Sequence, residues 1–198
     1  MAINREEAIY HLSKIKVAGN EEGLIPAFGV LVNQLPTDFW NSFAWKILEK
    51  AGEDLYEQAS WLLENAAHEC GYHTGYGIIN SDEFQSVIAP MIEDMPEDVL
   101  HGAYAVFTAW GWGKAEIVEL VPGEKMVVRA EEYYEADIRH THDIKHHFAY
   151  MMRGVAAGFM DLAYGEAYPN GLGTFQCEQT KGIEVGDAYG EFVVSRAH

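Results

Sequence analysis

The chain has 198 residues, of which 48% are hydrophobic and 22% are charged, so it is long enough for one sizeable core and too apolar for wholesale disorder. Its 31 acidic and 13 basic residues give a formal net charge of −18. Since nucleic acids and anionic membranes attract basic surfaces, this charge disfavours direct contact with either. The two cysteines suggest no disulfide framework, and the sequence contains neither an apolar signal segment nor a run of about 20 apolar residues. We therefore expect a soluble cytoplasmic protein.

The first part of the chain has the patterns of helices. Asn4 followed by Glu7 is typical of a helix start, and apolar residues then recur at helical spacing until Gly19. Gly and Pro residues over 23–36 predict a short helix with turns. A long helical region follows over about residues 37–69, in which Gly52 is a candidate break.

Two further helices and a hairpin are predicted next. Ser81 suits the N-cap of a short helix that Pro90 closes, and Pro96 suits the first turn of a helix that ends at Gly111. Apolar runs then flank Pro122-Gly123, as expected for a β-hairpin over about 117–128.

The last predicted elements complete an α+β domain. We expect a long helix over about 143–164 and strands over 173–180 and 188–195, joined by a turn at Gly186-Asp187. N-terminal helices followed by two β-hairpins that flank a long helix define the fold class. We expect one domain over 1–198, with a helical part at 1–95 and a core at 96–198.

The last hundred residues contain the most distinctive motifs. They run from Gly111-Trp112-Gly113 through RGVAAGFMDLAYG to GDAYGEF at 186–192. In this order they resemble the 4-vinyl reductase domain family, which includes phenol-sensing input domains of some bacterial transcription activators. The resemblance covers roughly residues 100–194. It implies a fold shared with NO-sensing haem domains and trafficking-complex ligand-binding domains, and a pocket for a small apolar or aromatic molecule.

The resemblance also implies a position for a zinc site. Family members that bind zinc use a cysteine on the long helix, and a glutamate and two cysteines in the last two strands. Alignment of GDAYGEF with the family pattern places these ligands near Ala149 and at Gln179, Gly182 and Gly190. Zinc needs about four N, S or O donors, and only Gln179 offers even a weak one. We therefore expect the family zinc positions Gln179, Gly182 and Gly190 to be empty.

Aromatic and small residues of this part are the candidate ligand-binding residues. Gly154 and Gly158 lie one turn apart on the predicted helix, which allows a ligand or a backbone to approach closely. His147 is seven residues before Gly154 and extends the same helix face. Small-molecule pockets are mostly apolar with a few polar anchors. We expect this pocket to be lined by Trp110, Trp112, Tyr133, His147, Tyr150, Gly154, Gly158 and Phe159, with ordinary core packing as the alternative for each.

Histidines at two places are candidate metal ligands. His68 is followed closely by Cys70 and His73, and imidazole and thiolate donors together suit a transition metal. His142 and His146 are four residues apart in the predicted helix and read H-D-x-x-H, a near miss of the zincin motif. If the two segments converge, His68, His73, His142 and His146 form one site for iron or zinc. Otherwise they are solvated or capping residues.

Three functions remain open at this point. The first is a carrier, sensor or accessory protein that binds a small apolar or aromatic molecule, forms a homodimer and acts with a separately encoded enzyme or regulator. The second is an enzyme or enzyme subunit that uses His-bound iron or zinc in aromatic or tetrapyrrole metabolism, which metal analysis would distinguish. The third is a structural subunit related to the trafficking-complex proteins, with a large exposed apolar patch and no cavity. The sequence assigns no catalytic residue.

Overall fold

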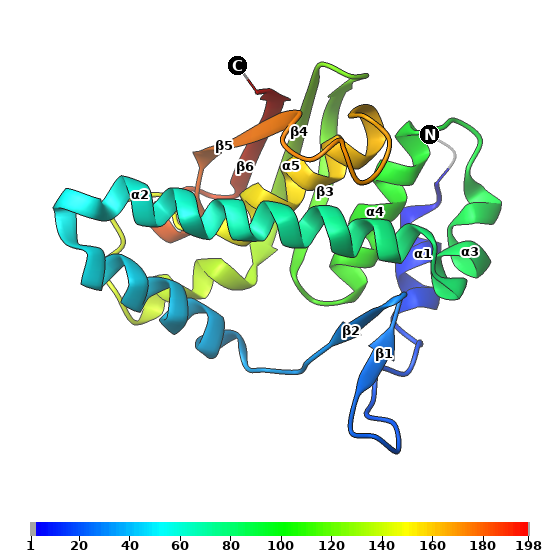
Figure 1. The fold of residues 1–198 in the computed structure, drawn as a ribbon, viewed down its shortest axis with the longest axis horizontal. Helices are drawn as coiled ribbons and strands as arrows, with labels where there is room; N and C mark the ends of the chain where they lie inside the picture. Colours follow the sequence, from blue (N-terminus) through cyan, green and yellow to red (C-terminus); the bar gives the residue numbers. More distant parts are fainter. Residues whose placement is uncertain (1–2, 198) are drawn as a thin grey trace.

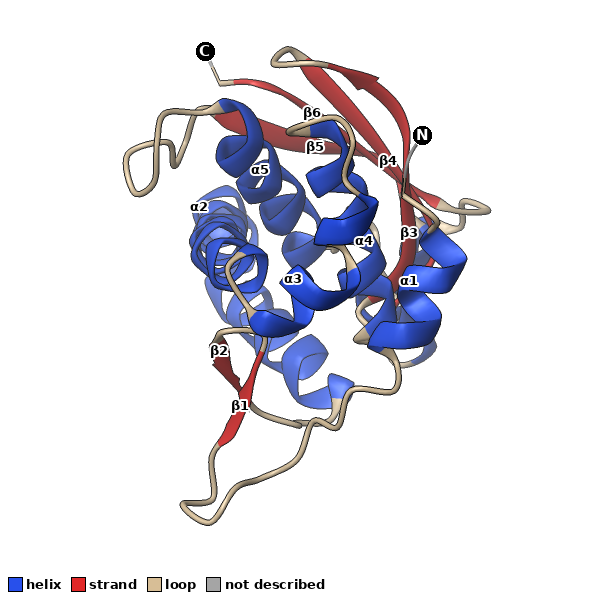
Figure 2. Cartoon of the chain, turned by 90° about the vertical axis from the view of Figure 1, so that its right-hand side faces the viewer, coloured by secondary structure: helices blue, strands red, loops and turns tan. Residues whose placement is uncertain are grey.

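A four-stranded antiparallel sheet forms one layer of the molecule, and helices cover one of its faces (Figure 2). The computed structural model describes residues 3–197 and orders the strands β3-β4-β6-β5. β3 (Gly113–Val121) and β4 (Lys125–Tyr133) form one hairpin, and β5 (Phe175–Lys181) and β6 (Gly190–Arg196) form the other. Buried and exposed residues alternate along β5, as expected when only one face of a sheet is covered.

The inner face of the sheet contacts α4 (Glu97–Ala109) and α5 (Tyr150–Tyr164), and the long helix α2 (Thr37–Ile79) packs against α5 from outside. Two glycines allow the close approach of α2 and α5. A Cβ atom at Gly154 would overlap the backbone of Ala67 and His68, and one at Gly158 would lie 2.6 Å from the Tyr72 nitrogen. No helix within residues 3–197 is long and apolar enough to cross a membrane.

The N-terminal part packs against α4 and α2. It contains α1 (Arg5–Leu12), a small hairpin of β1 (Ile25–Ala27) and β2 (Val30–Val32), α3 (Asp82–Val87) and the 3₁₀ turn η1 (Ala89–Met91). Figure 1 shows the β1–β2 hairpin at the opposite side of the molecule from the four-stranded sheet. The hairpin therefore contributes to a different surface.

The predicted fold class is confirmed, and so are two local features of it. Ser81 caps α3 by accepting a hydrogen bond from the Phe84 backbone nitrogen at 3.1 Å. Gly52 breaks α2 with a φ of +66°, and the limbs before and after it run in different directions (Figure 1). A positive φ is readily adopted by glycine because it has no Cβ.

Three predictions for the N-terminal part are wrong, two of them helix ends and one the type of an element. The first helix ends at Leu12 and not near Gly19. Residues 23–36 form the β1–β2 hairpin instead of a short helix, because its three-residue strands pair with each other across Phe28-Gly29. The long helix continues to Ile79, ten residues beyond its predicted end, because packing on α5 stabilises a glycine-rich stretch that propensity alone disfavours.

The start of the second long helix was also predicted wrongly. Residues Tyr134–His140 form the 3₁₀ segment η2, residues 141–149 are a loop, and α5 begins at Tyr150 and not near Asp143. The reason is tertiary. The buried Glu135 side chain of η2 accepts hydrogen bonds from the free backbone N–H groups of Met151 and Met152. The first turn of the helix therefore forms where this acceptor lies.

Candidate functional site

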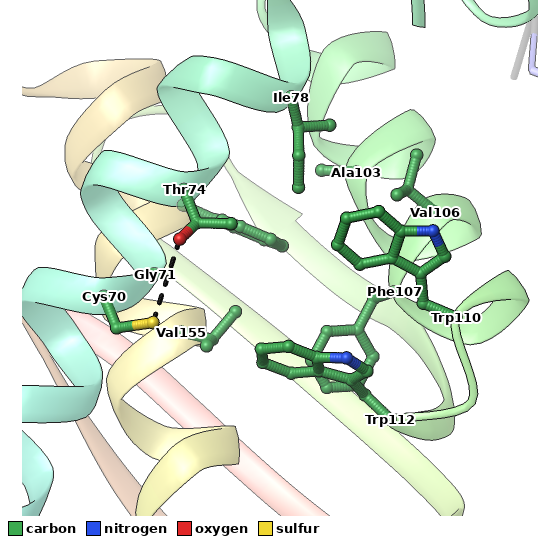
Figure 3. Close-up of a pocket in the computed structure, with 11 residues that line it drawn as sticks. Cys70, Gly71, Thr74, Ile78, Ala103, Val106, Phe107, Trp110, Trp112 and Val155 are labelled. Carbon is green, nitrogen blue, oxygen red and sulfur yellow. Dashed lines mark hydrogen bonds between the residues drawn. The ribbon is translucent and has the colours of Figure 1, made fainter. Parts of the chain in front are cut away.

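A small apolar pocket lies where α2, α4 and α5 meet. Figure 3 shows Trp110 and Trp112 on one side of it and Cys70, Thr74 and Val155 on the other. Its volume is about 20 Å³. A cavity of that size holds about one water molecule, so an aromatic ring enters only when lining side chains move. The lining is almost entirely apolar and consists of Cys70, Gly71, Thr74, Ile78, Ala103, Val106, Phe107, Trp110, Trp112, Val155 and Phe159.

A larger groove continues outward from this pocket. Its volume is about 530 Å³, within the range of sites for drug-sized ligands. Four residues line both spaces: Cys70, Thr74, Trp110 and Trp112. The outer wall is supplied by residues of 12–17, by β2 with the segment after it, and by Thr37 and Trp40 at the start of α2. The inner wall adds Tyr134 and Met151.

The two tryptophans at the junction are held by neighbouring rings. The Trp110 ring meets the buried Phe28 ring edge to face at 4.6 Å between centroids, and Trp112 contacts Phe107 at 5.4 Å. Phe28 has a φ of +51°, which is uncommon for a residue with a side chain. The β1–β2 turn thus reaches the junction directly, because Phe28 belongs to that turn and touches Trp110.

Uncharged polar groups face the same junction. The Cys70 thiol lies 3.8 Å from the Thr74 hydroxyl, one helical turn away (Figure 3). Tyr134 lines the groove, and burial, with smaller contributions from Glu135 and Cys70, raises the pKa of its hydroxyl, which stays protonated. Sequence reasoning did not assign Cys70 or Thr74 to a ligand pocket. The four-residue spacing of Cys70 and Thr74 on one helix face was the available signal.

The structure brings three of the predicted ligand-binding residues to the pocket. Trp110, Trp112 and Phe159 line it. Gly154 and Gly158 lie instead between α5 and the α2 backbone, where they set the distance between the two helices.

The other three predicted ligand-binding residues lie outside both cavity linings. The Tyr133 hydroxyl is buried near η3 (Ile183–Val185) and accepts a hydrogen bond from the Ile183 nitrogen at 2.9 Å. Tyr150 is the first residue of α5, and its hydroxyl is 3.2 Å from that of Ser60 on α2. His147 is half-buried in the loop before α5.

A hydrogen-bonded cluster occupies the position of the family zinc site. Gln179 accepts from the Ala149 nitrogen at 3.2 Å and donates to Glu184 at 2.8 Å. Glu184 also accepts from the Phe148 nitrogen at 2.8 Å and from the Tyr133 hydroxyl. This set contains no thiolate, and its carboxylate is already bound by three donors. The residues present therefore do not fit a tetrahedral zinc ion.

Glycines at two of the family ligand positions leave room for this cluster. A Cβ atom at Gly182 would lie 2.7 Å from the Gln179 amide nitrogen and 2.8 Å from Glu184. One at Gly190 would lie 2.6 Å from the Tyr133 ring. Any side chain at position 182 or 190 would therefore occupy space that this cluster fills.

A second buried carboxyl group, that of Glu135, contacts the start of α5. The two oxygens of Glu135 accept from the Met151 and Met152 nitrogens at 2.8 and 3.0 Å. Burial raises the pKa of Glu135 to about 8, although these two N–H groups oppose the shift. Acceptors at a helix start satisfy its free N–H groups, so Glu135 fixes where α5 begins.

The first pair of candidate metal-binding histidines serves contacts within the fold. His68 Nε2 is 2.6 Å from Asp161 Oδ2, and Asp161, which is fully buried, also accepts from the Gly173 and Phe175 nitrogens. His73 Nδ1 is 3.0 Å from the hydroxyl of Tyr168, in the loop before β5. Both histidines therefore tie α2 to α5 or to that loop.

The second pair lies elsewhere. The His142 ring contacts the Trp45 ring in a tilted arrangement with 4.3 Å between centroids, and the His146 ring is 5.0 Å from that of Tyr56. Both histidines lie in the loop 141–149, so the helical spacing assumed for them does not exist. The structure does not bring the four histidines together, and within residues 3–197 no three His, Cys, Asp or Glu side chains are grouped for a metal ion.

Comparison with known proteins finds relatives in structure alone. No protein-family model and no curated protein matches the sequence. The phenol-responsive sensory domain of the transcription activator PoxR, solved with phenol, aligns with 99% of this chain and 92% of its own at a TM-score of 0.74 and 13% identity. A trafficking protein particle complex subunit 3 from Naegleria fowleri, covalently bound to palmitic acid, aligns with 82% of this chain and 95% of its own, with a TM-score of 0.53 and 15% identity.

A third similar structure bears the name of the family that the sequence motifs resemble. It is a vinyl-4-reductase family protein from Methanocaldococcus jannaschii, with a TM-score of 0.48 and 12% identity over 84% of this chain and 85% of its own. At these identities the likeness is one of fold. The chain has a 4-vinyl reductase-like fold, which it shares over nearly its whole length with the phenol-responsive sensory domain.

Proposed function

We propose that this protein binds a small apolar or aromatic molecule in the groove and the pocket behind it, and acts as a carrier, sensor or accessory protein for a separately encoded partner. The single observation that carries this proposal is the continuity of the two cavities. A groove of about 530 Å³ leads past two tryptophans into an apolar pocket. Small-molecule sites in proteins are typically concave, with mostly apolar walls and a few polar groups that orient the ligand.

The structural relatives support the same proposal. One was solved with phenol and another with palmitic acid, so two proteins of this fold hold small molecules with large apolar parts. In this chain the aromatic rings of Trp110 and Trp112 offer faces for stacking, and the protonated hydroxyl of Tyr134 offers a donor. An apolar molecule with one or two oxygen atoms matches that arrangement.

We test binding with the variant Thr74→Trp. Its indole would fill the junction of pocket and groove, so we expect the affinity for phenol and 4-ethylphenol, measured by isothermal titration calorimetry, to fall at least about tenfold, or about 1.4 kcal/mol. Ala66→Trp adds the same side chain at an exposed position of α2 outside both linings and should bind like the wild type. Equal affinities of the two variants, with cooperative unfolding in both, would refute the proposed site.

We also propose that the protein forms a homodimer through α2. Large apolar side chains are exposed on this helix, with Phe43 at 51%, Trp61 at 65% and Leu62 at 56%. Such residues on one element are typical of an association surface. Sedimentation at micromolar concentrations should give twice the 22.2 kDa chain mass, and Trp61→Glu should shift the protein towards a monomer. A wild-type monomer over the whole range contradicts this proposal.

A further inference from the structure

The groove differs from the rest of the molecule in its lack of charge. Charged residues make up 22% of the chain. Yet none of the lining residues of the pocket or the groove, all within residues 3–197, is Asp, Glu, Lys, Arg or His. Lys14 and Lys16 alternate in sequence with lining residues but are exposed and do not line the groove, and the Lys14 ammonium lies over the Tyr10 ring. Uncharged side chains thus line the whole site.

This absence of charge discriminates among ligands. An anionic group buried in the groove loses hydration and meets no cation there, which is costly unless the group becomes neutral. The net charge of −18 adds a field that repels anions as they approach. A cationic group would lack a carboxylate partner in the lining. A neutral hydroxyl or carbonyl, in contrast, finds the hydroxyls of Thr74 and Tyr134 and the amides of Asn33 and Gln34.

The size of the groove discriminates further. An apolar cavity of about 150 Å³ already binds benzene, and this groove is about 530 Å³. Apolar side chains line it from Trp112 at the inner end to Leu31, Leu35 and Trp40 on the outer wall. A single ring leaves most of this surface hydrated, whereas a ring with an alkyl chain, or a chain alone, covers it. Each additional buried methylene then contributes to affinity.

We infer that the site selects an uncharged, elongated amphiphile, with an apolar body longer than one aromatic ring and a hydroxyl or carbonyl as its polar group, and rejects anions of the same length. This inference rests on the proposed function, because it names the ligand class for the same groove. It separates neutral phenols and alcohols from free carboxylates and phosphates. It also separates the groove from a site built for a single ring.

The test uses matched pairs of probes on the full chain. The 4-alkylphenols from methyl to hexyl are neutral at pH 7, and the 4-alkylbenzoates of equal length carry a carboxylate in place of the hydroxyl. Calorimetric titration should show an affinity gain of about fourfold for each added methylene of the phenol, following about 0.8 kcal/mol per buried CH₂. Each benzoate should bind at least about tenfold more weakly than its phenol.

A charge variant tests the reason for this selectivity. Asn33→Lys replaces an amide of the groove lining with a cation, so the affinity for each benzoate, relative to that for its matched phenol, should rise several-fold. Gln58→Lys adds the same charge at an exposed position of α2 outside the lining and should preserve the wild-type preference. An equal gain for the benzoates in both variants would mean that net charge, and not the lining, rejects anions.

The outcomes separate the two proposals. If phenol and its short derivatives bind but chain length adds nothing, or if benzoates bind as tightly as phenols, the inferred ligand class is wrong and the binding function stands. If no probe of either series binds, the proposed function is wrong, and the ligand class falls with it.

Discussion

Replacement of Asp161 with alanine should lower the free energy of unfolding by about 3–5 kcal/mol, the range expected when one partner is removed from a buried ionic network. Asp161 is fully buried on α5. Its carboxylate accepts from the Gly173 and Phe175 nitrogens, each at 2.8 Å, and contacts His68 on α2 at 2.6 Å. Alanine would leave the buried Phe175 N–H, the partly buried Gly173 N–H and an imidazole without this partner. The measurement is urea unfolding followed by circular dichroism.

Asp187→Ala is the matched control for this prediction. The Asp187 side chain is exposed in a turn and accepts from the Gly182 nitrogen at 2.9 Å, so its loss should cost about 1 kcal/mol or less. Asp161→Asn keeps the volume of the side chain but places an amide near several donors, and should lie between the alanine variant and the wild type. A change below about 1 kcal/mol in Asp161→Ala would show that the network does not stabilise the fold.

A pH dependence should arise from Glu135. Its pKa is raised from an ordinary value of 4.5 to about 8 because it is buried. The folded state therefore holds a proton that the unfolded state has lost between these values. The contribution of Glu135 to stability is complete below pH 4.5 and declines as the pH rises to about 8, by at most about 1.4 kcal/mol per pH unit. Thermal or urea unfolding from pH 5 to 8 measures this decline.

Glu135→Gln isolates that contribution. Glutamine is neutral throughout, so this variant should lose stability less steeply over the same pH range than the wild type. Glu124→Gln changes an exposed glutamate in the β3–β4 turn and should keep the wild-type slope. Parallel pH profiles of the wild type and Glu135→Gln would mean that Glu135 is ionised in the folded protein throughout the range.

Several elements of this protein follow from its sequence because their causes are local. Ser81 caps α3 through an atom three residues away, and Gly52 breaks α2 because its own backbone adopts a positive φ. The hairpin around Pro122-Gly123 follows from alternating side chains and a turn, and both of its strands formed. The motifs from Gly111 to Phe192 implied a 4-vinyl reductase-like fold, and the structural relatives confirm it. The aromatic candidates Trp112 and Phe159 belong to these motifs, Trp110 lies directly before them, and all three line the pocket.

Only the tertiary structure decided where α5 begins and what lines the groove. The backbone N–H groups around the start of α5 donate to three side chains from separate segments, Glu135, Gln179 and Glu184. The helix therefore begins at Tyr150, after the histidines that the sequence analysis placed on it. The groove joins α2, the end of α4 and the β1–β2 hairpin, whose strands pair only with each other. Spacing along a chain reports contacts within one element. It does not report which elements meet, because that depends on packing between residues far apart in the sequence.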